Sequence, residues 1–300
     1  MSIDRLLYAH ACQIGGVCIV KHSTKEKQRE IVARNKEILV QNKVMERIQE
    51  FCLMDDEFMS KVFEDIECTT LLLRIILNKK DLQIISVCTE HYIKNLQGRS
   101  IRMDVRAVDS VGIFYNIEIQ RSDAGAVAKR ARYNSSLIDA NITQPGDDYE
   151  KLPESYVIFI TENDVHGKGY PIYHIDRRIE ETGELFGDKA HILYVNGKIK
   201  NDSELGKLMH DFYCKNPDDM YYKELRERTR YFKEDREGVK MMSRIMEELA
   251  SEVEKDTKMR EKSNIACALL ERGKDSYEEI ARLTGLSIEE VENLGRQYKE

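Results

Sequence analysis

The stretch that decides the fold is Ile101–Gln120, which reads I-R-M-D-V-R-A-V-D-S-V-G-I-F-Y-N-I-E-I-Q. Apolar and polar residues alternate in two runs on either side of Gly112, and alternation with a period of two is the signal of a β-strand. One face of the resulting hairpin is apolar. The opposite face is polar and carries, on the two runs together, Arg102, Asp104, Arg106, Asn116, Glu118 and Gln120.

The length of the loop decides which polar residues meet. A two-residue loop, Ser110-Val111, would pair Asp104 with Ile117 and place the two carboxylates on opposite faces. A three-residue loop, Ser110–Gly112, pairs Asp104 with Glu118 and puts a glycine at the last loop position, which is left-handed. Only this register keeps one face apolar. We therefore predict that Asp104 lies opposite Glu118, with Cβ atoms about 5 Å apart.

Two carboxylates that face each other repel, so the pair is stable mainly when a positive charge lies between them. The sequence leaves two sources of that charge open. Arg102 or Arg106 of the same hairpin is one of them, and a divalent cation is the other. Mg²⁺ favours an oxygen site with one or two protein carboxylates, several waters and a phosphate.

Five stretches in a fixed order resemble a known family. They are D-D-E-F-M-S-K-V-F (Asp55–Phe63), R-M-D-V-R-A (Arg102–Ala107), N-I-E-I-Q (Asn116–Gln120), A-K-R-A-R-Y-N-S-S-L-I-D (Ala128–Asp139) and G-K-G-Y-P-I-Y-H-I-D-R-R-I (Gly167–Ile179). From about Asp56 to about Leu249 the chain resembles the PD-(D/E)-x-K nuclease superfamily. The resemblance is closest to its bacterial branch of recombination-promoting nucleases and transposases.

The resemblance implies an α/β fold, with a restriction-endonuclease-like mixed β-sheet core flanked by helices and an added helical C-terminal region. It implies that Asp104 and Glu118 are catalytic and hold Mg²⁺ or Mn²⁺, with the Ile119 carbonyl as a further ligand. Gln120 takes the position where the motif usually has lysine, and a glutamine orients water by hydrogen bonds but carries no charge. Relatives often place an acid of the first helix near the metal, and the candidates here are Asp56, Glu64 and Glu67.

A helix is predicted from Ser122 or Asp123 to about Asn141, directly after the second strand. The segment Arg121–Arg132 carries four cations (Arg121, Lys129, Arg130 and Arg132) against one anion, Asp123. In an acidic protein this is a local patch where a DNA phosphate can bind. We expect the phosphate-binding role to fall on Arg130, and less so on the other three.

The pattern divides the whole chain into four segments: an N-terminal segment and helix (1–54), the nuclease-like core (55–200), a charged helical region (201–262) and a small helix-turn-helix-like module (263–300). Within the core we predict one first helix over Asp56–Asn78, and a hairpin over Ile192–Lys200 that turns at Asn196-Gly197. The other core strands are expected at Leu82–Thr89, Ser155–Thr161 and Pro171–Ile179. For the N-terminal segment we expect an amphipathic helix over Thr24–Phe51.

The C-terminal module is predicted to contain three short helices, Asn264–Arg272, Tyr277–Leu283 and Ile288–Gln297. Its pattern resembles a helix-turn-helix, in which the last helix would read DNA. That helix, however, carries Glu289, Glu290 and Glu292 near its start, and these acids repel phosphates. The charge pattern therefore favours a packing or protein-contact module.

Composition sets further bounds. The net charge is −7 over 300 residues, so a nucleic-acid binder of this kind depends on a local basic patch. No apolar run approaches the roughly 18 residues of a membrane span, so we expect no membrane partner. The seven cysteines are scattered without a C-x-x-C pair, which indicates thiols in a reducing cytoplasm and argues against a zinc site.

These observations favour a Mg²⁺-dependent DNA endonuclease linked to recombination or mobile elements, with DNA as its partner. The alternative is a catalytically inactive nuclease-fold module that binds nucleic acid or protein. A weaker third reading is a transcriptional regulator that acts through the C-terminal helices. The sequence leaves a homo-oligomer open.

Overall fold

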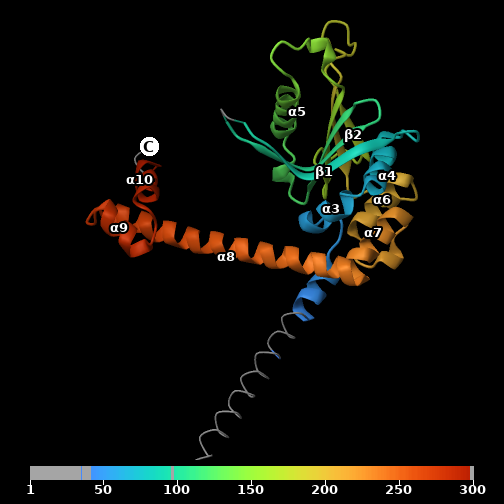
Figure 1. Ribbon diagram of the computed structural model, residues 1–300. Coiled ribbons are helices and arrows are strands. Elements are labelled where there is room, and N and C mark those ends of the chain that lie inside the picture. Colours follow the sequence, from blue (N-terminus) through green and yellow to red (C-terminus); the bar gives the residue numbers. More distant parts are fainter. Residues whose placement is uncertain (1–34, 36–41, 96–97, 298–300) are drawn as a thin grey trace, which may run out of the picture. The chain divides into compact units, whose positions relative to one another are not determined.

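The computed structural model describes residue 35 and residues 42–95 and 98–297, and the expected helix over Thr24–Phe51 lies mostly outside these residues. The chain divides into two compact units, with the boundary between Val239 and Lys240. The first unit is an α/β domain and the second is helical (Figure 1). Among the described residues, no helix is long and apolar enough to cross a bilayer.

The first unit is built on a mixed six-stranded sheet with the order β1-β2-β3-β4-β6-β5. β1, β2 and β3 form an antiparallel meander, β4 runs parallel to both β3 and β6, and β5 is antiparallel to β6. This is the mixed, helix-flanked sheet of the predicted restriction-endonuclease-like fold. The strand bounds are Ile84–Ile93 (β1), Ile101–Asp109 (β2), Phe114–Gln120 (β3), Ser155–Thr161 (β4), Ile172–Ile175 (β5) and Ala190–Asn196 (β6).

The central hairpin, β2–β3, has the predicted register. Val105 pairs with Ile117 across the two strands, and this pairing belongs to the three-residue loop. Gly112 has φ = +87°, the left-handed conformation that the last loop position requires. Asp109 stabilises the turn, because its Oδ1 accepts hydrogen bonds from the backbone N–H groups of Val111 (3.0 Å) and Ile113 (2.9 Å).

Helices cover both faces of the sheet (Figure 1). α5 (Ala128–Ile142) forms the connection between β3 and β4 and lies on one face, where its Leu137 and Ile138 share a core with Phe114 and Phe159. The layer on the other face is formed by four helices, α3 (Asp56–Phe63), α4 (Ile66–Leu77), α6 (Glu204–Tyr213) and α7 (Lys223–Glu234). The first six residues of β3 are consequently buried on both faces, including the polar ones.

The first helix is interrupted, so the prediction of one helix over Asp56–Asn78 was wrong. α3 covers Asp56–Phe63 and α4 covers Ile66–Leu77. Asp65 lies between them in an extended conformation and begins the second helix, because its carboxylate accepts a hydrogen bond from the Cys68 N–H (3.0 Å). An aspartate in this position is a strong helix N-cap.

The predicted hairpin at Asn196-Gly197 was also wrong. β6 ends at Asn196, and its antiparallel neighbour β5 comes earlier in the chain. The glycine is needed for a close approach instead. Its N–H donates to the Thr161 carbonyl oxygen (2.8 Å), and a Cβ atom at Gly197 would lie 2.5 Å from that oxygen. Such a contact is far inside van der Waals distance, so a larger residue would push β6 away from β4.

The second unit contains most of α8 (Arg236–Arg272) together with α9 (Tyr277–Thr284) and α10 (Ile288–Gln297). The predicted short helix over Asn264–Arg272 is the last part of the 37-residue α8. The core of the second unit consists of Ala266, Ile280, Ala281, Leu286 and Val291. The turn between α9 and α10 passes through Gly285 at φ = +67°.

Candidate active site

The two predicted carboxylates lie where the β2–β3 ladder ends. The last regular pair on this side is Val105 with Ile117, so the next pair in register is Asp104 with Glu118. Asp104 Oδ2 accepts a hydrogen bond from the Ile119 N–H (2.8 Å). Because the N–H and C=O of one strand residue point toward the same neighbouring strand, the Ile119 carbonyl also points toward β2, the side on which Asp104 lies.

Both carboxyl groups lie in an environment that disfavours negative charge. Glu118 is 0% exposed and Asp104 is half-buried. Burial raises the pKa of both carboxyls, and the charge of Asp104 raises the pKa of Glu118 further. Desolvation and like-charge repulsion act in the same direction here. A cation near the pair would relieve both effects.

In this structure that positive charge comes from α5. Arg130 Nη2 forms an ion pair with Glu118 Oε2, and Asn134 Nδ2 donates to Glu118 Oε1 (3.3 Å). Within the described part of the chain, neither Arg102 nor Arg106 forms an ion pair with the two carboxylates, although the charge of Arg102 lowers the pKa of both. Of the two sources of charge that the sequence left open, the hairpin arginines therefore make no ion pair with these carboxylates among the described residues, and the divalent cation stays a proposal.

Arg130 also contacts Gln120, the residue at the usual lysine position. Its Nη1 donates to Gln120 Oε1 (3.2 Å) and to the Gly125 carbonyl oxygen (2.9 Å). The guanidinium lies 5.8 Å from the centre of the Phe159 ring, within cation–π range. The space around Gln120 is tight, since a Cβ atom at Gly125 would lie 1.9 Å from Gln120 Oε1.

A cleft of about 880 Å³ opens beside these groups. Asp56, Asp104 and Gln120 line it together with a set of cations, namely Arg99, Arg102, Lys129, Arg130 and Arg132. Glu118 lies behind the lining, fully buried under α5. Carboxylates and cations therefore meet in one cleft, as a phosphate-processing site requires.

Of the three first-helix acids, the structure brings only Asp56 to the cleft. Burial raises the pKa of Asp56, and its charge in turn raises the pKa of Asp104, so the two carboxyls are close. Glu64 is exposed and paired with Lys61, and Glu67 is exposed on α4. Both lie outside the cleft lining. The sequence alone did not separate the three, because all are polar positions within the single helix that the pattern predicted.

The structure changes the interpretation of two further residues, Arg121 and Asn134. Arg121, one of the four cations predicted to form the phosphate patch, bonds to the Met54 carbonyl oxygen (3.1 Å) and to Asp55 Oδ1 (3.1 Å). It therefore ties β3 to the segment before α3. Asn134 was missed by the sequence analysis, and its position four residues after Arg130 on one helix face was the available signal.

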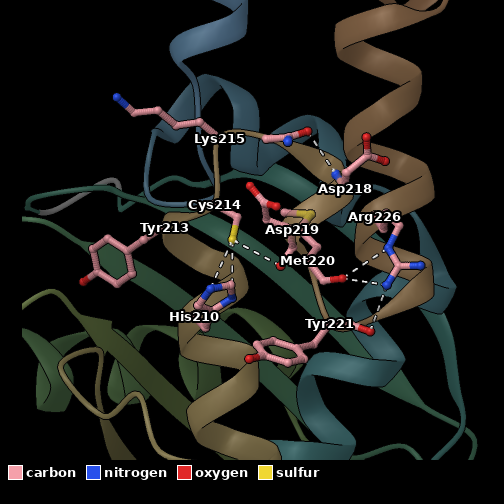
Figure 2. A pocket seen from close by; sticks show the side chains of 10 residues that line it. His210, Tyr213, Cys214, Lys215, Asp218, Asp219, Met220, Tyr221 and Arg226 are labelled. Atoms are coloured by element: carbon pink, nitrogen blue, oxygen red, sulfur yellow. Dashed lines mark hydrogen bonds between the residues drawn. The ribbon is translucent and has the colours of Figure 1, made fainter.

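A second group of potential metal ligands lies at the end of α6 (Figure 2). The Cys214 thiol points at the His210 ring (Sγ to Nδ1, 3.4 Å), and Asp211 lies beside them. Both Asp211 oxygens, however, accept backbone N–H groups, from Tyr221 (2.8 Å) and Tyr222 (2.9 Å). Only two ligand atoms remain free of such bonds, whereas zinc sites use three or four protein ligands. This group holds the loop after α6.

Comparison with known proteins adds one finding. A family model described as PD-(D/E)XK nuclease family transposase matches residues 64–268, more than half of the chain. The matched region contains Asp104, Glu118, Gln120 and Arg130, and Asp56 lies just before it. Searches of curated proteins and of solved structures found no match.

Proposed function

The chain belongs to the PD-(D/E)XK nuclease family of transposases, and we propose that it is a metal-dependent endonuclease that hydrolyses phosphodiester bonds in DNA. The observation that carries the proposal is the pairing of Asp104 with Glu118 beside a cleft lined by cations. A role in recombination or in mobile elements is the biological setting that we propose on the basis of the family.

Nucleases of this superfamily generally use divalent metals such as Mg²⁺. The residues here fit such an ion, because Asp104, Glu118 and the Ile119 carbonyl offer the oxygen ligands that Mg²⁺ and Mn²⁺ prefer. Asp56 adds a third carboxylate at the same cleft. When bound, the ion supplies an activated water and positive charge at the phosphate.

The protein's own side chains then have separate roles. Gln120 orients the attacking water through its amide, which accepts and donates hydrogen bonds. Arg130 contacts the substrate phosphate. Lys129 and Arg132 are exposed on the first two turns of α5, where they bind the DNA backbone. This local patch explains how a chain of net charge −7 attracts a polyanion.

One observation favours the alternative, an inactive nuclease-fold module. Arg130 already neutralises Glu118, and the uncharged Gln120 replaces the usual lysine. A protein with these features and no metal would keep the fold and the basic cleft while losing hydrolysis. The two functions therefore differ in whether a metal-dependent rate exists.

The first testable prediction is that supercoiled DNA is nicked in Mg²⁺ or Mn²⁺ by the parent protein and not by Asp104→Ala. Removing a metal ligand should lower the rate by at least about a hundredfold, the scale of losing several kcal/mol of charge stabilisation. Glu67→Ala is the matched control, since it removes an exposed carboxylate outside the cleft and should leave the rate unchanged. Equal background rates for the parent and Asp104→Ala in both metals would rule out the enzyme and leave the binding module.

A further inference from the structure

The E-x-Q motif of β3 lacks the cation that the E-x-K motif carries, and the structure shows a cation in contact with both of its polar side chains. Arg130 reaches across from α5, and its two terminal nitrogens bond separately to Glu118 and Gln120. These contacts span 12 and 10 residues of sequence and join a helix to a strand. The guanidinium is partly exposed, with 35% of its side chain accessible from the cleft side of the unit.

We propose that Arg130 supplies the catalytic positive charge that a lysine on β3 supplies in the common motif, so that in this chain the charge comes from α5. The inference rests on the proposed function and deepens it. A contact to the phosphate by itself would contribute only to DNA affinity, whereas a catalytic charge also raises the rate of hydrolysis. An arginine stays protonated at any working pH, so it cannot serve as a base. It acts by holding positive charge at the reacting phosphate, and no bond to Arg130 forms or breaks.

The surroundings of Arg130 hold its charge in place before substrate arrives. The Gly125 carbonyl accepts from Nη1 at 2.9 Å, and the ring of Phe159 lies beneath the guanidinium. Charge that is oriented in advance stabilises a transition state more than mobile charge does. Lys129, the preceding residue, is exposed and forms no ion pair with another residue of the described part of the chain. Substitution of Arg130 should therefore affect mainly the reaction rate, whereas substitution of Lys129 should affect DNA binding.

The identity of residue 120 fits this arrangement. Gln120 Oε1 accepts a hydrogen bond from Arg130, whereas the ammonium of a lysine here would have no lone pair to offer and would repel the guanidinium. Glycine at position 125 makes room for the Gln120 side chain, because a Cβ atom at that position would lie 1.9 Å from Gln120 Oε1. Gln120 and Arg130 thus act as one unit, in which the strand supplies the acceptor and the helix supplies the charge.

The test separates charge at the reacting phosphate from affinity for DNA. Single-turnover nicking and DNA binding, the latter with Ca²⁺ in place of Mg²⁺, are measured for the parent, Arg130→Gln, Lys129→Gln, Gln120→Lys and the double variant Gln120→Lys/Arg130→Gln. Arg130→Gln should lower the rate about a hundredfold, the scale for one preorganised donor, and change the DNA Kd by less than about threefold. Lys129→Gln should weaken binding and flatten its salt dependence.

The decisive variant is the double one. If catalysis requires the positive charge but not its position on α5, adding Gln120→Lys to Arg130→Gln should raise the nicking rate at least about tenfold. Thermal melts with and without millimolar Mg²⁺ give a readout apart from activity, and Arg130→Gln should keep the Mg²⁺-induced rise in Tm. If Arg130→Gln does not fold, two other variants allow the same comparison. Arg130→Lys keeps the charge on α5, and Gln120→Lys/Arg130→Met places it on β3.

Three results would overturn the inference while leaving the nuclease intact: an undiminished rate in Arg130→Gln, no recovery in the double variant, or loss of the Mg²⁺ shift in Arg130→Gln. The last would mean that Arg130 only positions Glu118. A parent that does not nick DNA overturns the proposed function itself, so the two failures are distinguishable.

Discussion

At the scale of single residues, the candidate active site depends on the register that places Asp104 opposite Glu118. Their positions follow from Gly112, whose left-handed backbone allows the three-residue loop. A slip of one residue would send Glu118 to the opposite face of the sheet. The cost of burying these groups appears in their pKa values. Burial raises the pKa of both carboxyls, the charge of Asp104 raises the pKa of Glu118 further, and the charge of Asp56 raises that of Asp104.

These raised pKa values predict how metal binding depends on pH. A carboxyl with a higher pKa in the folded state holds more protons there than in the unfolded chain, so its contribution to stability is lost as the pH rises through the folded pKa. A metal requires both carboxyls deprotonated, and its binding therefore strengthens as the pH rises. The Mg²⁺-induced increase in Tm should be larger at about pH 8.5 than at about pH 6.

Melting curves at these two pH values, with and without millimolar Mg²⁺, check this expectation. Asp104→Ala serves as the reference, since it removes one titrating ligand, and its Tm should respond little to Mg²⁺ at either pH. An equal Mg²⁺ shift at both pH values in the parent would mean that these carboxyls do not titrate on metal binding.

At the scale of elements, the break between α3 and α4 directs Asp56 to the cleft while Glu64 and Glu67 remain outside it. Asp65 creates the break by capping α4 through the Cys68 N–H. α4 then ends at Leu77, and the next residue, Asn78, adopts a left-handed conformation (φ = +51°). Two short helices with separate directions therefore replace one long helix.

The cap predicts the effect of a substitution at Asp65. Asp65→Ala should lower the free energy of unfolding by about 1 kcal/mol, because the Cys68 N–H loses its acceptor. Asp65→Asn is the matched control and should cost much less, since asparagine caps helices about as well as aspartate. Urea denaturation of the three proteins measures both values. A similar loss in the two variants would indicate that the charge of Asp65, and not its cap, stabilises the helix.

At the scale of the whole molecule, the proposed catalytic residues belong to the first unit, and the C-terminal helices form a core of their own around Ile280 and Val291. α10 begins with a capping box, in which the Glu290 carboxylate accepts from the Ser287 N–H (2.7 Å). Glu289, Glu290 and Glu292 give the start of this helix a negative charge, which disfavours DNA.

Deleting Ser263–Glu300 should accordingly leave DNA affinity within about twofold of the parent, because phosphate contacts dominate affinity and the module offers few. Fluorescence anisotropy at one fixed salt concentration measures the two Kd values. The truncation shortens α8 but removes every buried residue of the C-terminal core, which avoids exposing half of that core. A large loss of affinity in the truncated protein would assign a DNA-binding role to the module.

The sequence by itself determined the features that depend on near neighbours in the chain. Alternation and one glycine set the register of the hairpin, and a run of apolar, β-forming residues marked β4 over Ser155–Thr161 as predicted. The ordered motifs were enough to recognise the family. Asp65 and Gly197 also carry local information, but their roles cannot be recognised from the pattern. An N-cap inside a helical pattern looks like an ordinary helix residue, and a glycine needed for close approach looks like a turn residue.

Only the tertiary structure decided which charged groups meet at the cleft. Asp56 reaches Asp104 across 48 residues of sequence, and Arg130 reaches Glu118 because α5 packs on the face of β3 that carries it. Periodicity shows which residues share a face of an element, but the position of a helix over a sheet comes from the packing of side chains such as Leu137 and Phe159. The source of the positive charge beside the carboxylates therefore followed from packing, and the local sequence left it open.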